Sequence, residues 1–113
     1  MQLASFVHPD LVICRLTASS KKRLFETVSE RIASQCDQLT ALQIFEGLFA
    51  RERLGSTGMG DGIAVPHCRI KEASTDCCAV VTLDEPMNYD APDNKPVDIL
   101  IFLVVSGEAC QDH

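Results

Sequence analysis

The chain has 113 residues, of which 46% are hydrophobic and 23% charged, and it carries a net charge of −6. This size fits one compact domain with a modest core, and the acidic pI near 4.9 argues against a nucleic-acid-binding surface. The longest apolar run, Ile99–Val105, is far shorter than the roughly 18 to 20 residues of a membrane span, so we expect no membrane insertion.

Six cysteines raise the question of a disulfide framework. They lie at positions 14, 36, 68, 77, 78 and 110. The chain begins MQLASFVHPD, which lacks the basic and apolar regions of an export signal. We therefore expect free thiols and a cytoplasmic location.

The first predicted elements are a strand and a helix. Leu11–Leu16 is short, apolar and β-branched, and it follows a turn predicted at His8–Asp10. Ser19 or Ser20 can cap the helix, which is expected to end near residues 35–38. Apolar residues at helical spacing mark the face that should lie on the core: Leu24, Phe25, Val28 and Ile32.

A second helix has a well-marked start and end. Thr40 with Gln43 three residues later forms a capping-box pattern. Arg51 and Arg53 fall in the last predicted turn, where cations suit the helix dipole, and Gly55 is placed to end the helix. The pattern therefore delivers two arginines at one helix end.

Three β-rich segments follow, at Ile63–Val65, Cys77–Leu83 and Val97–Val105. The last segment is apolar except for Asp98, which is typical of a central strand covered on both faces. Two helices would scarcely cover both faces of a sheet, so we expect a layered α/β fold with another helix after residue 113. Residues 84–96 hold three of the five prolines and are interpreted as a surface connection.

A glycine-rich stretch, Arg51–Ile70, reads RERLGSTGMGDGIAVPHCRI. Its spacing does not fit a dinucleotide-binding fingerprint, because Ile63 stands where the third glycine is required and the stretch follows a helix. Val65 and Pro66 restrict the backbone leading into His67. We interpret the stretch as a scaffold that presents one imidazole.

Cysteine and histidine chemistry offers an alternative. Only Cys110 and His113 approach the spacing of roughly two to four residues found in paired zinc ligands. A thiol nucleophile at Cys68 would need His113 or His8 as its base, because the neighbouring His67 points away on an extended chain. A thiol or metal-binding module using Cys68, Cys110 and His113 stays open, although we expect neither metal nor cofactor.

His67 close to the helix-end arginines suits phosphoryl transfer. A neutral imidazole nitrogen can attack phosphorus in line without a metal. Guanidinium groups can hold the phosphoryl oxygens in charge-assisted hydrogen bonds.

At these residues the chain resembles the enzyme IIA domains of the bacterial phosphotransferase system, in the fructose, mannitol and nitrogen-regulatory group. The likeness covers nearly the whole chain and is carried by Arg51, LGSTG at 54–58, Gly60 and GIAVPH at 62–67. The segments YDAPD at 89–93 and KPVD at 95–98 are similar to the nitrogen-regulatory branch.

The resemblance implies roles for three residues. His67 matches the histidine that an HPr-like phosphocarrier phosphorylates on Nε2, and Arg51 matches the arginine that contacts the phosphoryl group. His113 matches a second active-site histidine that stabilises the phosphorylated state. Two departures stand out, since Cys68 replaces a glycine common after the active histidine and Ser106-Gly107 replace a proline-containing turn.

The implied fold is a three-layer α/β/α arrangement with a central mixed sheet flanked by helices. Residues 1–113 are expected to form a single type 2 IIA domain that lacks its C-terminal helices. The implied function is that of a phosphocarrier whose phosphorylation state regulates target proteins. In the alternative, a sugar-specific IIA protein, His67 passes its phosphate to the IIB domain of a permease.

Overall fold

The computed structural model describes residues 7–36 and 38–107. In chain order the elements are β1 (Val7–Leu16), α1 (Lys21–Ala33), α2 (Ala41–Leu54), β2 (Gly58–Gly60), β3 (Ile63–Ala64), β4 (His67–Ile70), β5 (Cys77–Met87) and β6 (Val97–Ser106).

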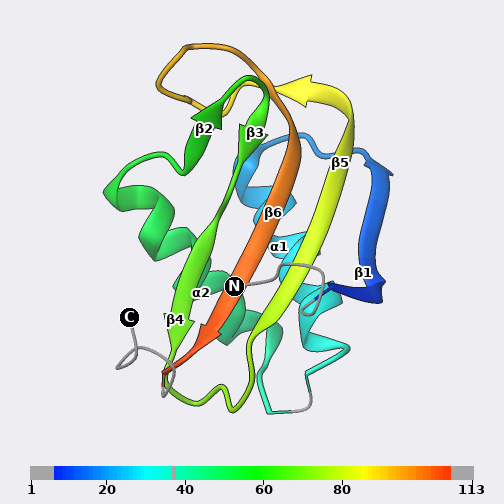
Figure 1. Cartoon of the computed structure of the whole chain (residues 1–113), viewed down its shortest axis with the longest axis vertical. Coiled ribbons are helices and arrows are strands. Elements are labelled where there is room, and N and C mark those ends of the chain that lie inside the picture. Colours follow the sequence, from blue (N-terminus) through cyan, green and yellow to red (C-terminus); the bar gives the residue numbers. More distant parts are fainter. Residues whose placement is uncertain (1–6, 37, 108–113) are drawn as a thin grey trace.

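The strands form one mixed sheet (Figure 1). Its order is β1-β5-β6-β3-β2, and β4 also pairs with β6. Strands β5 and β6 are antiparallel, whereas β3 and β4 both run parallel to β6. The predicted α/β class with a mixed sheet is therefore confirmed. Because β4 pairs only with β6, its outer side forms an edge of the described sheet.

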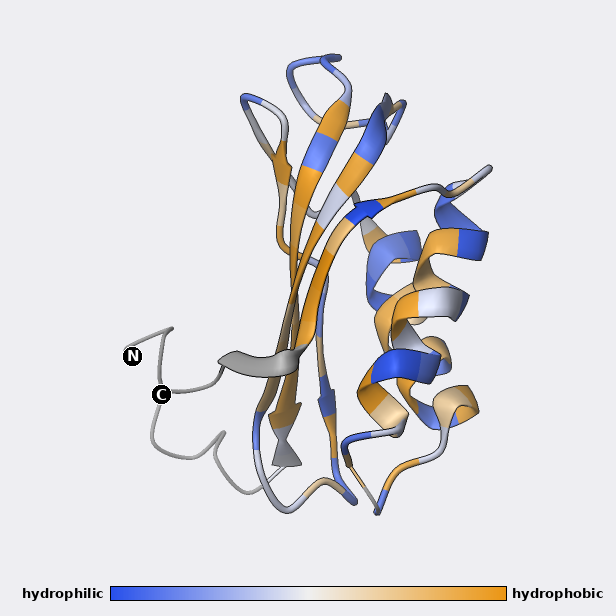
Figure 2. Cartoon of the chain, turned by 90° about the vertical axis from the view of Figure 1, so that its right-hand side faces the viewer, coloured by the Kyte–Doolittle hydropathy of each residue, from blue (hydrophilic) through white to orange (hydrophobic). Residues whose placement is uncertain are grey.

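Both helices pack against the same face of the sheet (Figure 2). Phe25 of α1 lies at the centre of this packing, with edge-to-face ring contacts to Phe102 of β6 at 5.3 Å and to Phe49 of α2 at 5.6 Å between centroids. The described residues thus form two of the three expected layers, and the further helical layer stays a prediction.

Strand β6 is covered on one face within the described residues, and the helix expected on its other face stays a prediction. Its side chains alternate between buried and partly exposed positions, and Ile99 is 41% exposed. Such alternation is typical of a sheet with one face on the core. The two described helices cover only that face, so the continuous apolar run does not show two-sided burial within residues 97–106.

Local capping signals were predicted well. Ser20 caps α1 by accepting a hydrogen bond from the backbone N–H of Arg23, and Thr40 and Gln43 form the full capping box of α2. Gly55 differs from its predicted role, since its backbone is extended and a Cβ there would touch nothing within 4 Å. A left-handed glycine turn therefore does not end α2.

Further boundaries differ from the sequence predictions. Strand β5 runs to Met87, into the stretch that was interpreted as a surface connection. Helix α1 ends at Ala33, before the expected residues 35–38. Strand β1 begins at Val7, so the backbone of His8–Asp10 belongs to the strand and not to a turn. The strand register shifts between Val7 and Val12, which accommodates a proline that lacks a ladder donor. No helix among the described residues is long and apolar enough to cross a membrane.

Candidate functional site

His67 is the first residue of β4 and its side chain is exposed. Its Nδ1 lies 2.8 Å from the carbonyl oxygen of Val65. A carbonyl oxygen only accepts hydrogen bonds, so Nδ1 must carry the proton and donate it. In the neutral ring the lone pair then resides on Nε2, which makes Nε2 the nucleophilic nitrogen.

The backbone before His67 is fixed on both sides. The N–H of Val65 donates to the carbonyl oxygen of Thr57 at 3.0 Å, and the N–H of Leu103 donates to the carbonyl oxygen of Pro66 at 2.9 Å. His67 itself lies opposite Leu103 in the pairing of β4 with β6. The predicted rigid lead-in to the imidazole thus rests on hydrogen bonds as well as on proline.

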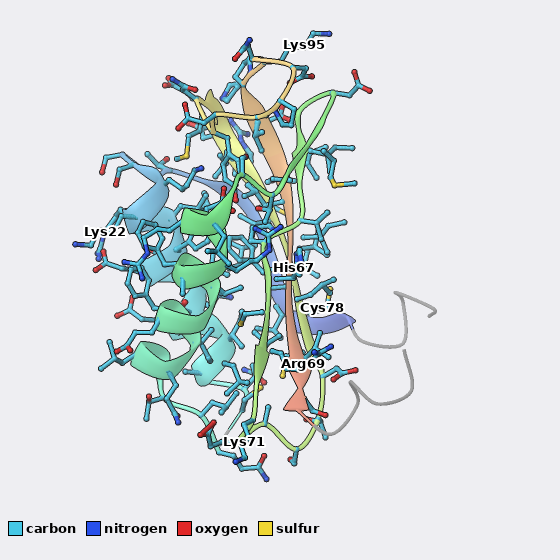
Figure 3. The ribbon with its side chains drawn as sticks, turned by 90° about the vertical axis from the view of Figure 1, so that its left-hand side faces the viewer. Lys22, His67, Arg69, Lys71, Cys78 and Lys95 are labelled. Carbon is cyan, nitrogen blue, oxygen red and sulfur yellow. The ribbon has the colours of Figure 1, made fainter. Side chains whose placement is uncertain are left out.

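A cleft of about 740 Å³ lies between β4 and the C-terminal half of α2, and His67 is one of the residues that line it. Figure 3 shows His67 and Arg69 along β4, beside this helix. The cleft is lined by Gly47, Ala50, Arg51, Arg53, Leu54, His67, Cys68, Arg69 and Val105. It brings His67 and Arg51 to one cavity, and it gathers three arginines in a chain whose net charge is −6.

Arg51 is half-buried in the last turn of α2. Its Nη1 donates to the carbonyl oxygen of Gly55 at 2.8 Å. This bond satisfies a carbonyl at the helix end and holds the guanidinium group, and it uses only one of the five N–H donors. The remaining donors suit an anion bound in the cleft.

Comparisons with known proteins identify the family of this chain. Residues 5–113 match the family model described as "Phosphoenolpyruvate-dependent sugar phosphotransferase system, EIIA 2". The chain belongs to the type 2 EIIA family. A nitrogen regulatory protein from Pseudomonas aeruginosa is 40% identical over 113 residues, which cover all of this chain and 73% of that protein.

Solved structures place the fold in the same family. The nitrogen regulatory protein IIA-Ntr of Neisseria meningitidis matches 96% of this chain and 74% of its own, with a TM-score of 0.90 and 37% identity. The Escherichia coli complex of enzyme IIAMtl with phosphorylated enzyme IIBMtl matches 94% of this chain and 75% of its own. Its TM-score is 0.76 at 15% identity, so that likeness concerns the fold alone.

Arg69 lines the same cleft as His67, and the sequence reasoning missed it. It lies two residues after His67 on β4, and both side chains are exposed while Cys68 and Ile70 are buried. Side chains two apart on a strand point to the same face, so His67 and Arg69 project together. This two-residue spacing was the available signal, and it becomes readable once residues 67–70 are known to form a strand.

Cys68 points to the other face of β4, toward α2. It is 9% exposed, and burial raises the pKa of its thiol from the ordinary value of 9.0 to about 12. A thiol with this pKa is almost fully protonated at neutral pH and is a poor nucleophile. The EIIA domain therefore uses Cys68 as a packing residue, which weighs against the thiol alternative.

The metal alternative gains no support from residues 7–36 and 38–107, which contain no group of three or more potential ligands. The other members of that alternative, Cys110 and His113, lie outside the described residues. The role of His113 as a second active-site histidine therefore stays a prediction.

A buried ionic cluster at the end of α2 was also missed. Glu52 is only 7% exposed, and its carboxylate pairs with Lys21 of α1 at 2.9 Å. The side chains of Thr57 and Tyr89 bind the same carboxylate. We call Lys21, Glu52, Thr57 and Tyr89 the Glu52 cluster. No local sequence pattern predicts it, because Glu52 lies 31 residues from Lys21 and 37 from Tyr89.

Proposed function

We propose that this EIIA domain is a phosphocarrier whose His67 accepts a phosphoryl group on Nε2 from an HPr-like phosphohistidine protein. Its phosphorylation state then regulates the activity of partner proteins. The observation that carries this proposal is the hydrogen bond from Nδ1 of His67 to the carbonyl oxygen of Val65, which leaves Nε2 as the free nucleophile.

The transfer balances without a further reactant. The lone pair on Nε2 forms a bond to phosphorus while the bond between phosphorus and the donor's ring nitrogen breaks, and its electron pair returns to the donor imidazole. The Nδ1 proton of His67 stays on the hydrogen bond to Val65, so no base is needed to free Nε2. The role of the protein is to position the ring and to neutralise charge.

Arg51 is proposed to bind the phosphoryl oxygens, and its place in the cleft with His67 supports this role. Arg69 adds a second cation on the face of β4 that presents His67. His113 is proposed to stabilise the phosphorylated state, on the strength of the family resemblance. We propose that residues 1–113 belong to a single type 2 IIA domain that works in the cytoplasm.

The names of two relatives with 37–40% sequence identity favour the regulatory role. Both the Pseudomonas aeruginosa protein and the Neisseria meningitidis structure carry nitrogen-regulatory names at 37–40% identity. A sugar-specific role is the second candidate, because the family description names a sugar phosphotransferase system and a fold relative is bound to a phosphorylated IIB protein. In that case His67 would pass its phosphate to a IIB domain.

The test is phosphorylation of the protein by enzyme I, an HPr-like carrier and phosphoenolpyruvate. The wild type should acquire an acid-labile, base-stable phosphoryl group, and His67→Ala should acquire none. Absence of label on the wild type, or equal labelling of His67→Ala, would contradict the proposal. Transfer from the labelled protein to an isolated IIB domain would instead favour the sugar-specific role.

A further inference from the structure

We propose that Glu52 is a positioning residue for His67, acting through Thr57 and the backbone of Val65. The proposal rests on the proposed function for its catalytic meaning, but the orientation of the His67 ring can be tested separately. Three hydrogen-bonded links connect the buried carboxylate to the exposed imidazole.

The first link joins Glu52 to Thr57. The backbone N–H of Thr57 donates to the carboxylate at 3.2 Å (Oε2) and 3.3 Å (Oε1), and the Thr57 hydroxyl donates to Oε1. Thr57 is itself 5% exposed, so few water molecules compete for these bonds. The Glu52 carboxylate accepts hydrogen bonds from two donors of Thr57, so it fixes both the backbone and the side chain of Thr57.

The second and third links run from Thr57 to His67. The carbonyl oxygen of Thr57 accepts the N–H of Val65 at 3.0 Å, and the carbonyl oxygen of Val65 accepts Nδ1–H of His67 at 2.8 Å. The position of the Val65 peptide therefore sets the tautomer and the direction of the ring. Because the carbonyl oxygen of Thr57 holds that peptide, a shift of Thr57 would be transmitted to His67 through only two hydrogen bonds.

The rest of the Glu52 cluster holds the carboxylate in place. Lys21 Nζ pairs with Glu52 at 2.9 Å, donates to the carbonyl oxygen of Tyr89 at 2.7 Å and lies 3.9 Å from the centre of the Tyr89 ring. The Tyr89 hydroxyl lies 3.2 Å from Oε1 of Glu52. Burial of a carboxylate is tolerated when charge and hydrogen bonds compensate it, as they do here.

Neighbouring residues of α2 serve both sides of the site. Arg51 lines the cleft, whereas Glu52 is turned into the protein and holds the segment that orients His67. One helix end therefore fixes the cation and, through the three links, the nucleophile. If the Glu52 cluster only stabilised the fold, substitutions in it would not change the tautomer of the His67 ring. The experiment tests whether they do.

The readout is the tautomer ratio of His67 in the full chain, measured by two-bond ¹H–¹⁵N correlation NMR on the neutral ring. Wild type should show mainly the Nδ1–H form. Thr57→Val removes the hydroxyl bond but keeps the backbone N–H, and Glu52→Gln removes the charge but keeps the shape. Each should lower the ratio of Nδ1–H to Nε2–H by about three- to tenfold, the range expected for weakening one hydrogen bond.

Two matched variants serve as controls. Thr57→Ser keeps the hydroxyl and should retain the wild-type ratio, and Ile32→Val thins the core at a site outside the three links and should also retain it. All variants are compared at a temperature at which their amide spectra show the folded state. A wild-type ratio in both Thr57→Val and Glu52→Gln, or an equal change in Ile32→Val, would overturn the proposal.

The phosphorylation rate provides the catalytic readout. Thr57→Val should slow labelling of His67 by a factor similar to its change in tautomer ratio, while Ile32→Val should label at the wild-type rate. If wild type takes no label but the tautomer ratio responds as expected, the phosphocarrier function fails and the positioning role stands. If wild type is labelled but the ratio does not respond, the positioning role fails alone.

Discussion

Gly47 of α2 lies directly against Cys68 of β4. A Cβ built on Gly47 would come within 3.0 Å of the Cys68 sulfur and 3.5 Å of its Cβ. The absence of a side chain at Gly47 therefore lets the helix approach the strand closely. Because Arg51 follows one turn later on α2 and His67 precedes Cys68, this contact helps set the width of the cleft between them.

A double-mutant cycle tests the Gly47–Cys68 contact. Gly47→Ala alone should be nearly neutral, because a gain of about 1 kcal/mol in helix propensity is offset by crowding of the sulfur. In the Cys68→Ala background the crowding is gone, so Gly47→Ala should raise the free energy of unfolding by about 1 kcal/mol. Urea-induced unfolding measures both steps. Equal effects of Gly47→Ala in the two backgrounds would show that the Cys68 sulfur does not crowd a side chain at position 47.

The buried Cys68 thiol makes a pH-dependent contribution to stability. Its pKa is about 12 in the native state, against an ordinary value of 9.0. Between these values the native state keeps the proton and the unfolded state loses it, so stability falls as the pH rises. At pH 10 the loss from Cys68 should be on the order of 1 kcal/mol.

Urea titrations from pH 8 to 11 measure this loss. Cys68→Ala should reduce the alkaline loss of stability, whereas substitution of the exposed Cys14 by alanine should leave it unchanged. The interpretation of Cys68 as a buried packing residue would be wrong if Cys68→Ala had the same pH profile as wild type.

Arg51→Ala should slow phosphorylation of His67 by about 10- to 100-fold, because one preorganised donor to the transferring group is lost. The fold should be largely retained, since Arg51 is half-buried and its hydrogen bond is to the helix-end carbonyl of Gly55. Single-turnover transfer from a phosphorylated carrier, with circular dichroism as the check on folding, measures both. An unchanged rate would show that Arg51 does not stabilise the transferring phosphoryl group.

Arg69→Gln should reduce transfer by a smaller factor, about three- to tenfold, because Arg69 is exposed and its charge is partly screened. The effect should weaken as the salt concentration rises. Arg15→Gln is the matched control, since Arg15 is an exposed arginine on β1, at the other end of the sheet order. Equal effects of the two substitutions would indicate a general charge effect without a specific place for Arg69.

The sequence was most informative where the interactions are local. Ser20, Thr40 and Arg51 were placed from neighbours within a few residues, and Pro66 identified the stiff approach to His67. The resemblance to a known family then gave the mixed sheet. Such features can be predicted because residues close in sequence determine the backbone geometry at a helix end.

Contacts between residues far apart in the sequence could not be predicted, because no local pattern indicates them. Glu52 reads as an ordinary charged residue in a helix until folding brings Lys21 and Tyr89 to it. The cover of both faces predicted from the apolar run of β6 stays a prediction, because it depends on a helix expected after residue 113. Arg69 was hidden until its strand was known, since the side-chain direction depends on the period of the element.

The most direct test of the central claim is to determine which atom carries the phosphoryl group. After phosphorylation from phosphoenolpyruvate through enzyme I and the carrier, ¹⁵N and ³¹P NMR of the ¹⁵N-histidine-labelled protein can identify the bonded nitrogen. The hydrogen bond from Nδ1 to Val65 predicts attachment to Nε2 of His67. Phosphorus on Nδ1, or on any residue other than His67, would contradict the account.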